Sequence, residues 1–276
     1  MSTPLPHRVI IVAAGRGARL MPYTEERPKC LVPIAGKPML RRQIESFLAQ
    51  DVREFVVIAG YLAPVLETYC RNLADELGCS IHFVLNPEYE TNNVLHSLFY
   101  ANSYMHGNIA ISYGDIIYTS DVARALCNAA EDICLVVDRD FREAYLGRSD
   151  HPLDEAEVAT VAGNGSIDKV GKRAVPPGDA WGEYIGLTKL SNVGTECVNR
   201  VWQQLQTAYA GRLDQPFQRA GRFRNAYLTD LWQHLIDNSL AKLVPVEIHG
   251  CWREIDTGQD HQRAEALLGC GQKEWK

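Results

Sequence analysis

Residues 9–29 read VIIVAAGRGARLMPYTEERPK, an apolar β-branched run that leads into a basic loop rich in glycine. The four apolar residues 9–12 predict a buried strand, and open α/β sheets bind their ligands where such strands end. Gly15 and Gly17 allow the main chain to approach a ligand closely. The arginine and lysine side chains of the loop add positive charge suited to phosphate oxygens. The segment therefore predicts a loop that binds a polyphosphate.

Two well-known phosphate loops do not fit this segment. A P-loop has four residues between its glycines and then Gly-Lys-Ser/Thr, and residues 15–29 contain no such run. A dinucleotide-binding loop needs a glycine or an alanine three residues after Gly17, where Leu20 stands. The loop therefore belongs to another type.

Strand and helix patterns alternate along the chain as far as residue 138. We expect strands at 9–12, 55–59, 81–85, 109–113 and 133–137, with amphipathic helices between them. This alternation predicts an α/β fold with a doubly wound, mostly parallel sheet.

The pattern changes after residue 138. Residues 139–153 show neither a helical nor a strand period, whereas 158–170 predict a hairpin that turns at Gly163-Asn164-Gly165. We expect later strands at 181–190, 242–248 and 252–256, and helices around 198–205 and 228–236. We interpret residues 1–276 as one domain whose mixed sheet carries an inserted subregion after residue 138.

The composition is that of an ordinary globular protein. The 276 residues are 46% hydrophobic and 22% charged, with a net charge of −6. Residues 15–37 reverse this balance with five basic and two acidic side chains, which indicates a small anionic ligand and no nucleic acid. Eight cysteines without a Cys-x-x-Cys pair, and no signal core or apolar run of about 18 residues, predict a cytoplasmic protein without a membrane partner. The sequence is compatible with a homodimer.

Asp115 could bind a metal ion. It follows the strand at 109–113, so its carboxylate should lie at the same sheet edge as the basic loop. A carboxylate beside a polyphosphate is unfavourable unless a cation lies between them, and Mg²⁺ binds both kinds of oxygen. The position of Asp256 alone favours an N-cap of a helix that starts after Gly258.

The basic loop has the pattern Gly-x-Gly-x-Arg-Leu-x-Pro-x-Thr…Pro-Lys-x-Leu, which resembles the nucleoside-triphosphate transferase superfamily of sugar-1-phosphate nucleotidylyltransferases. The resemblance implies a Rossmann-like fold in which Arg19 binds the β and γ phosphates and Lys29 neutralises charge on the α-phosphoryl group. It also implies that Asp115 and Asp256 bind Mg²⁺. It assigns contact with the acceptor phosphate to Lys172, with Lys169 as a rival.

The same resemblance divides the chain into a nucleotide-binding half, about 1–138, and an acceptor-binding half, about 139–276. The residues implied at the nucleotide are Ala13, Ala14, Gly15, Arg16, Gly17, Gly60, Tyr61, Asn86, Asn92, Asn93 and Ser97. The asparagines could instead cap the helix that follows them. Gly60-Tyr61 and the series at 86–98 resemble the branch that handles phosphocholine and phosphonates, which implies CTP.

Residues 138–152 resemble nucleotidylyltransferases of phosphonate biosynthesis. The acceptor contacts that we predict are Arg139, Tyr145, Arg148, Lys172 and Glu183. Tyr145, Trp181 and Tyr184 could form an aromatic cage for choline, but the arginines at 139, 142 and 148 would repel that cation. They favour an acceptor with a second anionic group, or they belong to a solvated loop, and Glu183 could also face solvent.

These observations predict a Mg²⁺-dependent cytidylyltransferase that couples CTP to a small phosphonate and releases pyrophosphate. Phosphonoformate, 2-hydroxyethylphosphonate and 2-aminoethylphosphonate are candidate acceptors. Phosphocholine or a sugar 1-phosphate is the alternative acceptor. An alternative of another class is a catalytically silent subunit that senses nucleotides.

Overall fold

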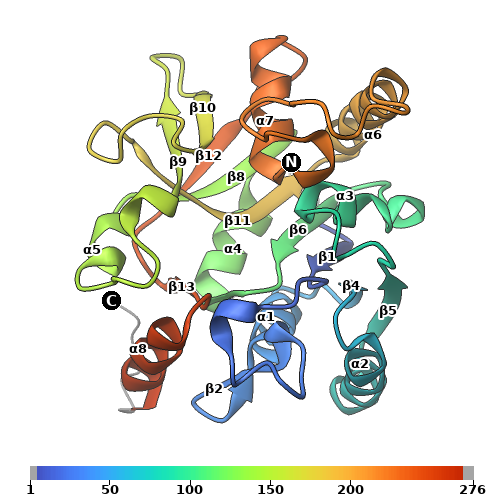
Figure 1. Ribbon diagram of the computed structural model, residues 1–276, viewed down its shortest axis with the longest axis vertical. Coiled ribbons are helices and arrows are strands. Elements are labelled where there is room, and N and C mark those ends of the chain that lie inside the picture. Colours follow the sequence, from blue (N-terminus) through green and yellow to red (C-terminus); the bar gives the residue numbers. More distant parts are fainter. Residues whose placement is uncertain (1–4, 270–276) are drawn as a thin grey trace.

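A computed structural model describes residues 5–269, in which a nine-stranded mixed sheet runs through the middle of the molecule (Figure 1). The strands of the sheet are β1 (Arg8–Val12), β4 (Glu54–Ala59), β5 (Ser80–Leu85), β6 (Ile109–Tyr113), β8 (Ile133–Asp138), β9 (Glu157–Val161), β10 (Ile167–Lys172), β11 (Gly182–Leu190) and β12 (Val244–Ile248). These bounds confirm the strands predicted before residue 138 and the hairpin after it, to within a few residues.

Parallel pairing dominates the first half of the sheet. β1 lies between β4 and β6 and is parallel to both, and β4 pairs in parallel with β5. β11 is antiparallel to β6 and to β8, and β12 returns parallel to β8. The β9–β10 hairpin joins the sheet through residues 182–183 of β11. The predicted Rossmann-like α/β fold with a mostly parallel mixed sheet is confirmed.

Helices cover both faces of the sheet because its buried strands are apolar on both sides. Ile10 and Val12 point to the face covered by α3 (Val94–Phe99), α6 (Asn192–Ala208) and α7 (Leu228–Asp237). Val9 and Ile11 point to the face covered by α1 (Met39–Leu48), α2 (Ala63–Leu77) and α4 (Ser120–Asn128). Strand side chains alternate between the faces, so one continuous apolar run supplies both cores.

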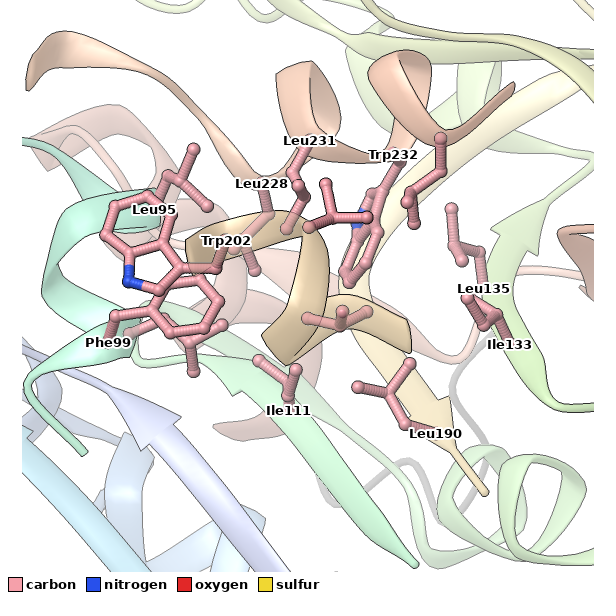
Figure 2. Packing of buried hydrophobic residues seen from close by; sticks show 14 of the residues in the cluster. Leu95, Phe99, Ile111, Ile133, Leu135, Leu190, Trp202, Leu228, Leu231 and Trp232 are labelled. Atoms are coloured by element: carbon pink, nitrogen blue, oxygen red, sulfur yellow. The ribbon is translucent and has the colours of Figure 1, made fainter. Parts of the chain in front are cut away.

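The first of these cores contains large aromatic side chains (Figure 2). The rings of Phe99 and Trp202 stack at a centroid distance of 4.1 Å. Leu228, Leu231 and Trp232 of α7 pack over the sheet residues in the same view. This packing fixes α3 and α7 against the sheet.

The carboxyl ends of β1 and β6 lie very close together. A Cβ atom on Gly114 would lie 2.8 Å from the Cβ of Ala13, so glycine is needed there. Directly after it, β7 (Ile116–Tyr118) pairs antiparallel with β13 (Trp252–Glu254). The main-chain N–H of Ile255 donates to the carbonyl of Asp115 at 2.9 Å. This pairing brings the neighbourhood of Asp256 to the end of β6.

Two parts of the fold differ from the sequence prediction. Residues 139–153 are not wholly irregular, because α5 (Phe141–Tyr145) forms there and buries Phe141 and Tyr145 against Val158. The strand expected to begin at residue 242 begins at Val244. The short hairpin of β2 (Pro33–Ile34) and β3 (Lys37–Pro38) follows the basic loop, and α8 (Gly258–Gly269) ends the described chain.

Among residues 5–269, each helix is too short or too polar to cross a membrane.

Candidate active site

A cavity of about 290 Å³ lies where β1 and β6 end, lined there by Ala14 and Asp115. The predicted site residues that line it are Ala14, Gly15, Arg19, Asn92, Asn93, Ser97, Asp115, Lys172, Glu183 and Asp256. They come from both halves of the chain. The structure therefore places the basic loop, the two aspartates and Lys172 around one space.

The basic loop wraps around the side chain of Lys29. Gly17 has a φ of +64°, and a Cβ atom there would lie 3.0 Å from the Cβ of Lys29. The hydroxyl of Thr24 donates to the carbonyl of Gly17 at 3.0 Å and holds this turn. Lys29 itself begins a short 3₁₀ turn and is 11% exposed. The loop thus fixes the direction of one ammonium group.

That ammonium group bridges the two aspartates. Nζ of Lys29 donates to Oδ2 of Asp115 at 2.9 Å and also to Asp256. Burial alone would lower the pKa of Lys29, but the two carboxylates more than offset it and hold the pKa above its ordinary value. Burial would raise the pKa of Asp256, but Lys29, together with His151 and Arg19, holds it well below its ordinary value. Lys29 is therefore a cation and Asp256 an anion.

Capping does not explain Asp256. Oγ1 of Thr257 accepts from the N–H of Asp260 at 3.2 Å, and Oδ2 of Asp260 accepts from the N–H of Thr257 at 2.9 Å. This reciprocal pair caps α8. The carboxylate of Asp256 instead receives donors from Arg19 and Lys29.

The two aspartates fit a divalent cation. Their carboxylate oxygens are the donor type that Mg²⁺ prefers, and the Lys29 ammonium already places positive charge between them. Oδ1 of Asp115 is buried without a hydrogen-bond partner among the described residues. His151, Glu254 and Asp256 also bring one donor atom each within 4.8 Å of one another.

Asparagines form a network beside the cavity. Asn86 is fully buried and donates to Oδ1 of Asn92 at 2.9 Å and to Oγ of Ser97 at 2.8 Å. Asn92 and Ser97 line the cavity, whereas Asn86 lies behind them. Asn93 lines the cavity and also caps α3, because its Oδ1 accepts from the N–H of Val94. The capping interpretation therefore holds for Asn93, and its contact with a nucleotide stays a prediction.

Gly60 and Tyr61 support the loop from behind. The N–H of Tyr61 donates to the carbonyl of Ala14 at 3.0 Å, and a Cβ atom on Gly60 would lie 2.5 Å from Tyr89. The guanidinium of Arg16 lies 5.6 Å from the ring centroid of Tyr61. The cavity lining formed by the described residues does not include Ala13, Arg16, Gly17, Lys29, Gly60, Tyr61 and Asn86, although Lys29 contacts the lining residues Asp115 and Asp256.

Of the two rival lysines, Lys172 reaches the cavity. Its Nζ donates to Glu155 at 3.1 Å and lies 5.1 Å from the ring centroid of Tyr227. Lys169 is exposed, and it is absent from the lining formed by the described residues. Burial would lower the pKa of Lys172, but Tyr227 and the neighbouring glutamates raise it above its ordinary value.

Two buried glutamates face the same cavity. Glu183 accepts from the hydroxyl of Tyr145 at 2.7 Å, and Glu157 accepts from the hydroxyl of Tyr113 at 3.1 Å. Burial is the largest cause that raises the pKa of each carboxyl to about 8. Glu183 therefore does not face solvent.

The predicted arginine contacts with an acceptor are not supported. Arg148 is 6% exposed and pairs with Asp260 at 2.6 Å and with Glu254 at 3.0 Å. Arg142 donates to main-chain carbonyls at 177–180, and Arg139 stacks on the ring of Trp181 at 4.1 Å. Among the described residues these arginines do not line the cavity. The structure instead pairs the charge of Arg148 with two carboxylates inside the protein.

Tyr145 also differs from its predicted role. It is absent from the cavity lining found among residues 5–269, and its hydroxyl is used to bind Glu183. Its ring lies 4.8 Å from the guanidinium of Arg148. Tyr145 thus positions a lining residue from behind.

We predict that Arg148 stabilises the fold. Arg148→Met should lower the free energy of unfolding by about 3–5 kcal/mol, because it leaves buried carboxylates without their partner. Urea unfolding followed by circular dichroism measures this loss. Arg71→Met is the matched control, because the 70% exposed Arg71 forms a surface pair with Glu67 and should contribute about 0–1 kcal/mol. Equal losses in the two variants would contradict a buried structural role.

Among the residues of the site that the sequence prediction missed are Glu254, His151 and Glu157. Glu254 lies two residues before Asp256, and strand alternation could have placed both carboxylates on one face. His151 is buried with Nδ1 3.1 Å from Oδ2 of Asp256. Glu157 begins β9 and had no local signal, because only the register with Lys172 on β10 brings it to the cavity.

Comparisons with known proteins show the family of this chain. Residues 9–176 match the sequence profile of the family described as "MobA-like NTP transferase domain". The chain therefore belongs to this family of nucleotidyltransferases, as the basic loop predicted.

Individual relatives are more specific. The chain is 34% identical over 261 residues to a CTP:phosphoglutamine cytidylyltransferase of Campylobacter jejuni, which covers 91% of this chain and 96% of the relative. It is 31% identical over 140 residues to a CMP-5'-(3-aminopropyl)phosphonate synthase of Streptomyces rubellomurinus. That match covers 50% of this chain and 22% of the relative.

Solved structures show the same fold at low sequence identity. The CTP:phosphocholine cytidylyltransferase of Streptococcus pneumoniae has a TM-score of 0.67 and 20% identity, and the match covers 95% of this chain and 98% of that one. The inositol-1-phosphate CTP transferase of T. maritima has a TM-score of 0.71 and 19% identity, with 98% of both chains covered.

Proposed function

We propose that this protein is a Mg²⁺-dependent cytidylyltransferase that transfers CMP from CTP to a small acceptor ending in a phosphonate or phosphate group. The observation that carries the proposal is the single cavity that joins Arg19, Asp115 and Asp256 to Lys172. The positive charge of Arg19 and the metal-binding oxygens of the two aspartates suit a triphosphate, and Lys172 suits the acceptor anion. Residues 1–138 then supply most of the nucleotide site, and residues 139–276 supply most of the acceptor site.

The reaction is an in-line substitution at phosphorus. An acceptor oxygen forms a bond to the α-phosphorus of CTP, the bond to the β-phosphate oxygen breaks, and its electron pair leaves with pyrophosphate. The acceptor oxygen is already anionic, so no side chain has to remove a proton. Positioning and charge stabilisation therefore supply the catalysis.

Each charged group has a distinct task in this proposal. Lys29 stabilises negative charge that develops on the α-phosphoryl group, and Arg19 binds the phosphates that leave. Asp115 and Asp256 would hold Mg²⁺, which supplies further positive charge to the triphosphate when bound. Lys172 orients the acceptor anion.

The similar proteins support CTP and two kinds of acceptor. Both sequence relatives described above carry names that include CTP or CMP. The aminopropylphosphonate synthase supports a small phosphonate, which is the acceptor we favoured from the sequence. Phosphoglutamine is the second candidate, because its enzyme is 34% identical over nearly the whole of both chains. The assembled cluster of Arg19, Lys29 and two aspartates argues against a silent nucleotide sensor.

A substrate panel tests the proposal. Pyrophosphate release should require CTP, Mg²⁺ and an acceptor, and CTP should exceed UTP and ATP. The acceptors are 2-aminoethylphosphonate, phosphoglutamine, phosphocholine and glucose 1-phosphate. Glucose 1-phosphate with UTP as the best pair would contradict the proposal in favour of a sugar nucleotidylyltransferase. Tight CTP binding without turnover on any acceptor would indicate a sensor.

A further inference from the structure

The end of the cavity near Lys172 is acidic. The carboxylates that line the cavity there are Glu155, Glu157, Glu183 and Glu254. Lys172 lies directly across the β9–β10 pair from Glu157, and Glu183 pairs with the residue next to Glu157. The ammonium of Lys172 is already bound by Glu155 at 3.1 Å. A second anionic group on an acceptor would therefore lie against these four carboxyl groups.

Glu183 has an unused hydrogen-bond acceptor. Its Oε1 accepts from the hydroxyl of Tyr145, whereas Oε2 is buried and has no partner within residues 5–269. The residue is 4% exposed and lines the cavity. A buried acceptor without a donor is costly, and a ligand donor at this position removes the cost.

The groups around Glu183 do not neutralise it. Tyr145 donates its one hydroxyl hydrogen, and Arg148 is itself paired with Asp260 and Glu254. Burial is the largest cause of the raised pKa of Glu183, and the negative charges of Glu254 and Asp138 raise this pKa further. Glu157 is in a similar state, because its pKa is also raised to about 8 by burial. The site therefore favours a cation that can donate hydrogen bonds.

We propose that the acceptor carries a protonated amine whose N–H groups donate to Oε2 of Glu183, with Glu157 as the second carboxylate. This inference rests on the proposed function, because it names the acceptor class of the same site. A trimethylammonium group has no N–H and would leave Oε2 unpaired. A hydroxyl group could donate to it but would bring no compensating charge. Both an aminoalkylphosphonate and phosphoglutamine carry such an amine, and the carboxylate of phosphoglutamine would have to point away from these glutamates.

Two isosteric pairs of acceptors test the amine. The first pair is 2-aminoethylphosphonate and propylphosphonate, which replaces the ammonium with a methyl group. The second is phosphoglutamine and the analogue in which a methyl group replaces its α-ammonium. Within at least one pair we expect the amine to have about 10²-fold higher kcat/KM, because a site built for a donor rejects the analogue that lacks it. 2-Hydroxyethylphosphonate and phosphocholine should both be poorer than the best amine by about tenfold or more.

A variant assigns the effect to Glu183. Glu183→Gln keeps the shape of the side chain and removes its charge, so the preference within the responsive pair should fall to about tenfold or less. Glu247→Gln is the matched control, because Glu247 is an exposed strand residue of β12 that pairs with Arg139. It should keep the preference of the wild type.

The pH profile adds a readout that a structural role would not give. Glu183 must be ionised to pair with an ammonium, and its pKa in the free site is raised to about 8. The kcat/KM ratio of amine to isostere should therefore rise as the pH increases from about 6.5 to 8.5, while the amine stays protonated. This rise should disappear in Glu183→Gln.

The outcomes separate the two proposals. Turnover of any acceptor without a preference for an amine in either pair would overturn this inference and leave the cytidylyltransferase intact. An unchanged preference in Glu183→Gln, or phosphocholine as the best acceptor, would overturn it as well. If none of the acceptors in the panel led to pyrophosphate release, the proposed function would be overturned, and this inference with it.

Discussion

Lys29→Ala should lower kcat with CTP by about 10²-fold or more and change the KM for CTP much less. The ammonium lies between Asp115 and Asp256 and is held there by the loop that packs on its stem. In the proposed reaction its charge matters most when negative charge moves from the α-phosphoryl group to pyrophosphate. Steady-state kinetics over a range of CTP concentrations measures both constants.

The control for Lys29 comes from the same basic segment. Lys37 is 40% exposed and pairs with Glu45, away from the cavity residues that the structure describes. Lys37→Ala should leave both constants within about twofold, since surface pairs contribute little. An effect of Lys29→Ala confined to the KM for CTP would show that Lys29 only binds the nucleotide, and the catalytic role would be wrong.

Asp115→Asn should lower turnover at saturating Mg²⁺ by about 10²-fold or more. The substitution preserves shape, but it removes charge from the group whose Oδ1 is buried without a hydrogen-bond partner in the described chain. EDTA should abolish pyrophosphate release in the wild type, and added Mg²⁺ should restore it. The concentration of Mg²⁺ needed for half-maximal rate should rise in the variant.

Asp121→Asn is the control for this aspartate. Asp121 is 70% exposed and forms a surface pair with Arg124 at the start of α4. The turnover and the metal requirement of Asp121→Asn should match those of the wild type. Full turnover by Asp115→Asn at saturating Mg²⁺ would contradict the assignment of Asp115 as a metal ligand.

Features formed by neighbours in sequence could be predicted from the sequence. The basic loop, the strand before it and the position of Asp115 after β6 all follow from contiguous patterns of apolar residues and glycines. The hairpin of β9 and β10 follows from its turn at 163–165 in the same way. Each of these signals lies within about 20 residues, where local chemistry decides the conformation.

Features formed by distant pairs could not be predicted. The charge of Arg148 is visible in the sequence, but its partner Asp260 lies 112 residues later and only the fold brings them together. Only the family resemblance indicated that Asp115 and Asp256 meet, because the three-residue strand β7 that brings them together is too short to give a periodic signal. The acidic end of the cavity near Lys172 similarly depends on the pairing of β9 with β10 and β11. The sequence therefore shows the charge of the arginines at 139, 142 and 148 without showing their partners.

The most direct test of the central claim is ³¹P NMR of a reaction with CTP, Mg²⁺ and each acceptor in turn. We predict that one amine-bearing acceptor gives a new pair of coupled phosphorus signals from a CMP-linked product. Pyrophosphate should appear in equal amount, and the triphosphate signals should decrease to match. CTP left intact with every acceptor, or inorganic phosphate formed without a CMP-linked product, would contradict the account.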